Sequence, residues 1–236
     1  MHRSAPRLTR LLACAAVPVM LVVAGCSSDS GSSGKKESSP SSTPSPSKSP
    51  TVEKAVFAKL PDACKSISAK TIADLVPKVK DKSGTEDKSS DLSARAGCSW
   101  NGLQSKGTKG SQYRWLSVSY LRYDSDPVLG SGAKRAEQQY TKSVSDVQAT
   151  DGAKNVKSSP ATGLGNEATM VTYEQRKTDA DFNYALVVIR TENVVVVVNH
   201  NGAGFEGSKS PSVSDMTKGA QTASKEAVAA VAAANK

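Results

Sequence analysis

The alternation of apolar and polar residues predicts several β-strands. Residues 113–123 alternate over the longest stretch, and shorter strands are expected near residues 98–100 and 169–174. Because successive side chains of a strand point to opposite faces, the long stretch has two apolar faces. Leu116, Val118 and Tyr120 share one of these faces, and Trp115, Leu121 and Tyr123 share the other.

The clearest pair of neighbouring strands lies near the end of the chain. Residues 182–190 and 194–199 are predicted to form a hairpin through the turn at residues 191–193. Five consecutive valines begin at Val194 and leave the second of these strands without a polar side. A strand of this kind is typical of the middle of a sheet, and we expect it to be buried on both faces.

Three other segments repeat apolar residues every three or four positions, as an amphipathic helix does. They are residues 69–76, 132–147 and 213–234. A serine stands directly before each of them, where its hydroxyl is expected to cap the helix. Together the segments predict one α+β domain over residues 51–236, an antiparallel sheet of four to five strands packed by about three helices. The capping serines are Ser68, Ser131 and Ser212.

Residues 1–25 have the three parts of a signal peptide. Three arginines come first, thirteen apolar residues follow from Leu11 to Val23, and the small residues Ala24 and Gly25 precede Cys26. The apolar run is shorter than the roughly 20 residues that a helix needs to cross a bilayer. The pattern resembles a bacterial lipoprotein signal. The resemblance implies cleavage before Cys26 and a diacylglycerol on its thiol, with the alternative of an ordinary secretory signal cut nearby.

Residues 26–50 are predicted to be the lipidated Cys26 followed by a disordered tether. Of residues 27–50, twelve are serine and four are proline, and none of the others is apolar. Such a segment buries too little apolar surface to offset the entropy lost on ordering. As a flexible coil of 24 residues it spans about 25–30 Å. We therefore expect a domain held near the extracytoplasmic face of the cell membrane by a lipid anchor, with the tether either glycosylated or bare.

The formal charge of +9 falls when the chain is divided in this way. The predicted signal carries three of the positive charges and the tether one, so the folded domain is mildly basic. Neither this balance nor an exported location is typical of a nucleic-acid-binding protein. With two histidines in the whole chain a His-rich metal centre is excluded, and we expect no metal and no cofactor.

The chain has four cysteines, of which Cys14 would leave with the signal and Cys26 would carry lipid. Cys64 and Cys98 then form the one possible intramolecular pair. Exported domains lie in compartments where disulfides persist, so we predict a bridge between them, with two free thiols as the alternative. Closing a loop of this length stabilises a fold by about 3.8 kcal/mol in the chain-entropy treatment.

The search for catalytic groups leads to two residues, and neither is predicted to act. Ser131 begins a Ser-x-x-Lys pattern that ends at Lys134, but the further elements of that motif are missing, which favours an N-cap. His200 follows the valine-rich strand and is predicted to be a solvated turn residue. We expect a protein that is not an enzyme. The aromatic strands are the candidate ligand surface, with core packing as the alternative. The candidates are Trp100, Trp115, Tyr120 and Tyr123.

Two short motifs together resemble a known family. Cys98-Ser99-Trp100 follows the earlier Cys64, and Gly163-Leu164-Gly165-Asn166-Glu167-Ala168 opens a later strand. Over about residues 57–234 the chain resembles the actinobacterial lipoprotein domain of unknown function 3558. The resemblance implies a disulfide-clasped envelope domain without an active site.

The resulting hypothesis is a non-catalytic binding or sensing domain for an envelope ligand or a protein partner. The alternatives are a structural or assembly subunit of an envelope complex and a hydrolase that uses Ser131 or His200. A concave apolar pocket beside the aromatic strands would favour a ligand, and a solid surface would favour a protein partner.

Overall fold

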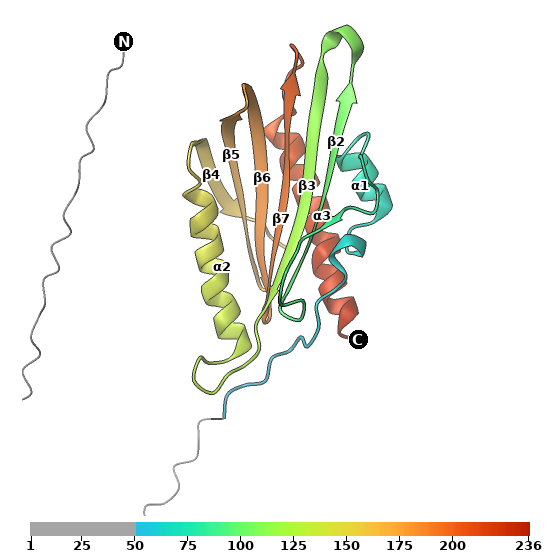
Figure 1. Cartoon of the computed structure of the whole chain (residues 1–236). Helices are drawn as coiled ribbons and strands as arrows, with labels where there is room; N and C mark the ends of the chain where they lie inside the picture. Colours follow the sequence, from blue (N-terminus) through green and yellow to red (C-terminus); the bar gives the residue numbers. More distant parts are fainter. Residues whose placement is uncertain (1–50) are drawn as a thin grey trace, which may run out of the picture. The chain divides into compact units, whose positions relative to one another are not determined.

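The fold is an α+β arrangement built on one antiparallel sheet (Figure 1). A computed structural model of the chain describes residues 51–236, so the predicted signal peptide, Cys26 and the tether lie outside the described residues. The sheet has seven strands in the order β1-β2-β3-β7-β6-β5-β4. They are β1 (Thr85–Glu86), β2 (Arg95–Ser105), β3 (Ser111–Arg122), β4 (Ala153–Pro160), β5 (Glu167–Lys177), β6 (Ala180–Thr191) and β7 (Val194–Phe205).

The prediction of four to five strands is wrong because both edge strands lack an apolar pattern. Seven of the eight residues of β4 are exposed, and β1 has two residues, both exposed. An edge strand is held by backbone hydrogen bonds to one neighbour and needs no buried side chain, so hydrophobic periodicity does not reveal it. Lys154, Lys157 and an irregular register between them mark β4 as an edge protected against further pairing.

The three predicted helices are present with bounds close to those expected. They are α1 (Ala69–Leu75), α2 (Gly132–Gln148) and α3 (Val213–Ala234). Two short 3-10 turns, η1 (Ala63–Lys65) and η2 (Gly107–Lys109), complete the described elements. Each predicted cap is confirmed, because the hydroxyls of Ser68, Ser131 and Ser212 accept hydrogen bonds from backbone N–H groups at the start of their helices. Within residues 51–236, no helix combines the length and apolar character that a membrane crossing requires.

The helices lie on opposite faces of the sheet. α3 and α1 cover one face, where alternate residues of β7 such as Val194, Val196 and Val198 join the main core. α2 packs on the other face, against Val188 of β6 and Val195 of β7. The valine-rich strand is therefore central and buried on both sides, as predicted. Its position between β3 and β6 makes it the axis of the sheet.

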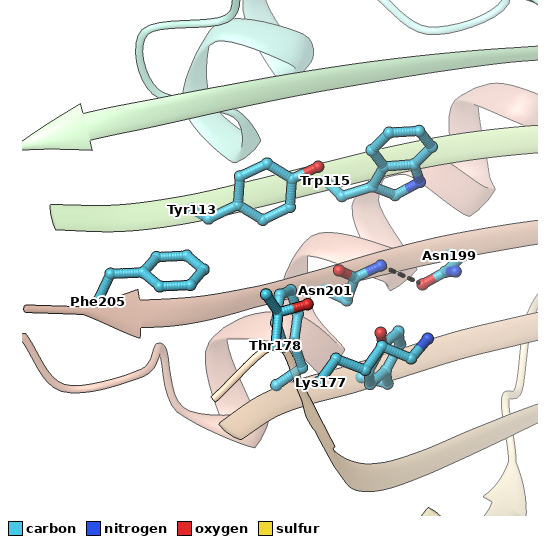
Figure 2. Close-up of a pocket in the computed structure, with 9 residues that line it drawn as sticks. Tyr113, Trp115, Lys177, Thr178, Asn199, Asn201 and Phe205 are labelled. Atoms are coloured by element: carbon cyan, nitrogen blue, oxygen red, sulfur yellow. Dashed lines mark hydrogen bonds between the residues drawn. The ribbon is translucent and has the colours of Figure 1, made fainter. Parts of the chain in front are cut away.

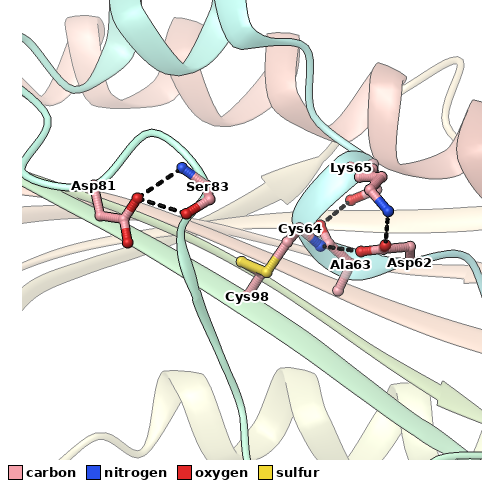
Figure 3. The surroundings of a disulfide bond; sticks show 8 residues. Asp62, Ala63, Cys64, Lys65, Asp81, Ser83 and Cys98 are labelled. Carbon is pink, nitrogen blue, oxygen red and sulfur yellow. Dashed lines mark hydrogen bonds and ion pairs between the residues drawn. A yellow bond between two sulfur atoms is a disulfide. The ribbon is translucent and has the colours of Figure 1, made fainter.

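The predicted disulfide joins Cys64 of η1 to Cys98 of β2 (Figure 3). It fastens the segment before α1 to the sheet, with a sequence separation of 34 residues. Gly84 passes directly over this bridge with a φ of +80°, and a Cβ there would lie 2.5 Å from the Cys98 Sγ and 2.6 Å from the Trp100 Nε1. A side chain at this position is excluded by both the backbone conformation and the contact.

Candidate functional site

The face of the sheet on which α2 packs is only partly covered by that helix. On this face, α2 packs against residues of β5, β6 and the first half of β7. Beyond α2 the side chains of this face on β3 and β7 are partly exposed, except that Asn201 and Ala203 are buried. The strand pairing places aromatic side chains there, since Tyr113 lies opposite Ala203, Trp115 opposite Asn201, and Tyr184 also opposite Asn201. We call this surface the aromatic face. Its residues are Tyr113, Trp115, Tyr173, Phe182, Tyr184, Asn199, Asn201 and Phe205.

The aromatic rings of this face touch one another in a continuous row. Tyr173 and Tyr184 stack with centroids 4.6 Å apart and planes inclined by 13°. Phe182 continues the row and meets Tyr113 edge-on at 6.1 Å and Phe205 edge-on at 6.2 Å. Ring pairs at these separations attract one another, so the contacts favour the observed positions of the rings. Six of the eleven aromatic residues of the chain lie on this one part of the sheet.

The aromatic face is hollowed into a pocket of about 480 Å³ (Figure 2). Asn199 and Asn201 form its floor, and the Asn201 amide donates to the Asn199 side-chain oxygen at 3.1 Å. Within the described residues, the Asn199 amino group and the Asn201 carbonyl oxygen have no other partner. The floor therefore offers one donor and one acceptor between walls of aromatic rings.

The pocket carries positive but no negative charge. Lys177, the last residue of β5, places its Nζ 5.3 Å from the centre of the Tyr184 ring, and no carboxylate is among the lining residues. Burial raises the pKa of Tyr113, and the nearby Tyr184 raises it further, so that phenol stays neutral. Aromatic faces beside neutral amide and hydroxyl groups suit a neutral polar ligand with flat apolar faces.

A second hollow of about 630 Å³ continues from the first toward the tips of the strands. The two share Tyr113, Thr178 and Phe205. Asp179 and Glu206 lie beside the second hollow, at turns where both residues have positive φ. Together the two hollows form a groove, which accommodates an elongated ligand better than a compact one.

Of the four predicted ligand residues, the structure places one on this face. Trp115 lines the pocket. Trp100 and Tyr120 lie in the main core with 1% of their surface exposed, and the Tyr120 hydroxyl points to the Ala227 carbonyl of α3 at 3.5 Å. Tyr123 packs beside α2 with the Arg135 guanidinium 5.4 Å from its ring centre. The four residues therefore do not form one site.

Sequence reasoning missed the residues that complete the pocket. Phe182 and Phe205 are apolar residues at the ends of strands, and Asn199 and Asn201 lie at and beyond residue 199, where the second strand of the hairpin was expected to end. The available signal was the alternation Asn199, Asn201, Ala203, Phe205, which continues one face of the strand past the valines. Its significance depends on the register with β3 and β6, which the sequence pattern does not reveal.

The prediction for His200 is also wrong. His200 lies within β7, 2% exposed, beneath α3 and not in a solvated turn. Its Nδ1 is 3.2 Å from the Met216 carbonyl oxygen and its Nε2 is 3.2 Å from the Leu75 carbonyl oxygen, so the ring bridges α3 and α1. Gly219 of α3 leaves room for the ring, since a Cβ at that position would collide with the His200 Nδ1.

The hydrolase alternative required Ser131 and His200 to lie within hydrogen-bonding reach of one another or of a carboxylate in a cleft, and their described hydrogen bonds are to backbone groups instead. Ser131 caps α2 on one face of the sheet, whereas His200 is buried on the face that α3 covers. Within residues 51–236, no group of three or more His, Cys, Asp or Glu side chains is arranged to hold a metal ion. The aromatic pocket remains the candidate site.

The features described so far define a disulfide-clasped α+β domain with an aromatic groove. A family model described as protein of unknown function (DUF3558) matches residues 21–179, which is more than half of the chain. The chain belongs to this family, as the sequence motifs indicated. The match begins inside the predicted signal peptide and ends before β6, so it covers Tyr113 and Trp115 but not the pocket residues of β6 and β7.

Among solved structures, the chain is similar to the crystal structure of LpqN, which is involved in cell envelope biogenesis of Mycobacterium tuberculosis. The two share 17% sequence identity, the comparison covers 54% of this chain and 68% of that chain, and the TM-score is 0.31. A likeness of this size says nothing about the role of the present chain. A search of the curated proteins finds no significant match.

Proposed function

We propose that this chain is a membrane-anchored extracytoplasmic lipoprotein whose domain binds a neutral glycan of the cell envelope at the aromatic face and catalyses no reaction. The observation that carries the proposal is the pocket of about 480 Å³ on the part of one sheet face that α2 does not cover. The location rests on the signal pattern that ends at Cys26.

The chemistry of the pocket supports a sugar over other ligands. A pyranose or furanose ring has apolar C–H faces that stack on aromatic rings and hydroxyls that both donate and accept hydrogen bonds. The pocket supplies the first need through Trp115 and Tyr113, and the second through the amides of Asn199 and Asn201. No carboxylate lines this pocket and Lys177 does, which disfavours a cationic group in it, whereas Asp179 and Glu206 line the second hollow of the groove.

Tryptophan fluorescence provides a direct test, because the chain has two tryptophans in contrasting places. Trp115 lines the pocket, whereas Trp100 is buried in the core and is a constant background. We expect neutral oligosaccharides from the envelope to change the emission of the protein in a saturable way. Matched oligosaccharides that carry amines should bind more weakly, because Lys177 faces the same pocket.

Substitutions on the aromatic face should weaken this binding without unfolding the domain. Trp115→Ala removes the fluorescent reporter, so the affinity of this variant is measured by calorimetry. We expect its affinity for the oligosaccharide to be lower by about tenfold or more, which corresponds to about 1.4 kcal/mol of binding free energy. Asn201→Ala should lower it as well. Val156→Ala on the exposed edge strand β4 is the control and should bind as the wild type does. Equal affinity in all three variants would refute the pocket as the binding site. A protein partner that binds the wild type but not Trp115→Ala would support an assembly role instead.

A further inference from the structure

Exposed apolar side chains lie at the end of the domain where the folded residues begin, directly after the predicted tether. Within the described residues, six large apolar residues are exposed, and four of them belong to segments at this end: Val56, Leu92, Val128 and Leu129. The other two, Leu103 and Val156, lie in β2 and β4. Single exposed apolar residues need no explanation, but four at one end of a domain indicate an interaction surface.

Hydrogen bonds hold these segments together. The Ser125 hydroxyl donates to the Glu53 carbonyl oxygen at 2.5 Å, which ties the loop before α2 to the first described residues. The Arg122 Nε donates to the Ser93 carbonyl oxygen at 3.1 Å, which ties the loop before β2 to the end of β3. We call this surface the anchor-proximal end; it consists of residues 51–57, 87–94, 123–131 and 191–193, and its loops appear at the lower end of the sheet in Figure 1.

Asn193 fixes this arrangement from inside. It is fully buried, and its amide donates to the carbonyl oxygens of Phe57 and Tyr123 at 2.9 Å each. Its side-chain oxygen accepts from the Phe57 N–H at 2.8 Å. One side chain in the turn between β6 and β7 therefore clamps both the entering segment and the loop before α2, so this end is built as a unit.

The loop that carries Val128 and Leu129 is itself stiff. The Asp126 carboxylate accepts from the N–H groups of Val128 and Leu129 at 2.8 Å each, which lowers the pKa of Asp126. Asp126 and Gly130 also exchange two backbone hydrogen bonds across the loop. The loop thus presents two apolar side chains outward with Val128 91% exposed, although neither contributes to the core.

We propose that the anchor-proximal end lies on the lipid surface and inserts Val128 and Leu129 among the headgroups. We favour the lipid surface as the partner of this end because the described residues begin here, at residue 51. Residues 26–50 connect this end to the predicted lipid on Cys26. A tether of 24 residues spans about 25–30 Å as a coil, which keeps the loop within reach of the bilayer. Lys54 and Lys134 are exposed beside the loop and suit lipid phosphates.

The mixture of charges at this end predicts how the contact depends on lipid. Residues 51–57, 87–94, 123–131 and 191–193 carry Lys54 and Lys88 against six carboxylates, a net charge of −4, so insertion depends on apolar burial and not on attraction to anionic lipid. We therefore expect insertion into zwitterionic vesicles to equal or exceed insertion into anionic vesicles. A strong dependence on anionic lipid would contradict insertion of the loop as the main contact.

The proposal rests on the lipid anchor of the proposed function, and the test separates the two. In the chain from Cys26 to Lys236, the Cys64–Cys98 bridge leaves Cys26 as the single thiol. That thiol can be coupled to a maleimide lipid in phosphatidylcholine vesicles, so the experiment does not depend on lipidation in the cell. Failure of the anchor appears separately, as a Cys26→Ala chain that remains in bacterial membranes as the wild type does.

The measurement is quenching of a new tryptophan by brominated phosphatidylcholine. In a Trp115→Phe background, Val128→Trp should be quenched at least about twice as strongly as Leu103→Trp, which lies in an exposed position on β2 outside this end. Equal quenching of the tryptophans at positions 128 and 103 would overturn the proposal. A protein partner would then be the better explanation for the apolar residues at this end.

A second measurement uses chains without an anchor and guards against distortion of the loop by tryptophan. The Cys26→Ser chain should partition into the same vesicles about tenfold more strongly than the same chain with Val128→Ser and Leu129→Ser. Circular dichroism should show equal folding of the two, because both side chains are exposed. Equal partitioning would also overturn the proposal.

Discussion

The covered and the open parts of the sheet differ in composition although the same strands form both. In the first half of β7, residues 194–198 lie beneath the helices and are all valines, as in Val195 beneath α2 and Val196 beneath α3. Farther along the same strand and on the same face as Val195, the open positions carry Asn199, Asn201 and Phe205. The change occurs where α2 no longer covers the face.

This difference teaches how one sheet serves two purposes. Aliphatic side chains fill space between a sheet and a helix and stabilise the fold by excluding water. Rigid aromatic rings with amides between them bury less aliphatic surface but present both apolar and hydrogen-bonding groups to an incoming molecule. The covered part accounts for stability and the open part for binding, and the following predictions test that division.

The largest effect is expected from two neighbours on β3 that face opposite ways. Leu116 is fully buried in the main core, so Leu116→Ala should lower the free energy of unfolding by about 2–5 kcal/mol. Trp115→Ala, on the open face, should lower it by about 1 kcal/mol or less while weakening ligand binding. Urea denaturation of both variants checks the pair, and an equal loss of stability would show that the aromatic face is part of the core.

A second contrast concerns His200 and acid. Burial lowers the pKa of His200 from 6.5, and the Met216 and Leu75 carbonyls oppose that shift, as does Asp215, while Arg114 adds to it. Because the folded state favours the neutral ring, stability is fully present above pH 6.5 and is lost as the pH falls through the lower folded pKa. Urea denaturation at about pH 7.5 and about pH 5 should show this loss.

His200→Gln is the matched control for that loss. Glutamine keeps a donor near the carbonyls but does not titrate, so the variant should lose less stability between the two pH values than the wild type. The carboxylates with lowered pKa, such as Asp62 and Asp126, titrate below 3.8 and do not contribute in this range. The same loss in both proteins would assign the acid sensitivity to other groups.

The smallest effect is expected at the caps of the two large helices. Ser131→Ala and Ser212→Ala each remove a hydroxyl that accepts from a backbone N–H, of Lys134 at 3.3 Å and of Asp215 at 3.1 Å. Each should lower the free energy of unfolding by about 1 kcal/mol, as measured by thermal or urea denaturation. Ser131→Ala should leave any activity found later unchanged, because Ser131 is a cap. A loss of activity at constant stability would support the hydrolase alternative in which Ser131 is the nucleophile.

Much of the fold follows from local patterns. The helices, their serine caps, the valine-rich central strand and the Cys64–Cys98 bridge were all predicted from the sequence and are confirmed. Each depends on information that lies within a short window or on a simple pairing of two cysteines. The edge strands β1 and β4 were missed because an exposed edge needs no apolar period.

The site was harder to predict than the fold. Trp100, Trp115, Tyr120 and Tyr123 were chosen as aromatic residues on strands, and alternation alone separates Trp115 from Tyr120. The alternation does not indicate which of the two faces of the sheet is completely covered by helices. That choice depends on the direction in which α2 and α3 cross the sheet, which is a property of the assembled domain.

The sequence by itself determined that residues 51–236 form an α+β domain with one disulfide, and it predicts a lipid anchor at Cys26. These conclusions follow from periodicity, capping and the chemistry of a few cysteines, which are local properties of the chain. Tertiary structure alone decided that Trp100 is core and Trp115 is surface, that His200 is buried between two helices, and that Val128 lies beside the point where the chain enters. The physical reason is that burial depends on what packs over a residue, and residues distant in sequence provide that cover.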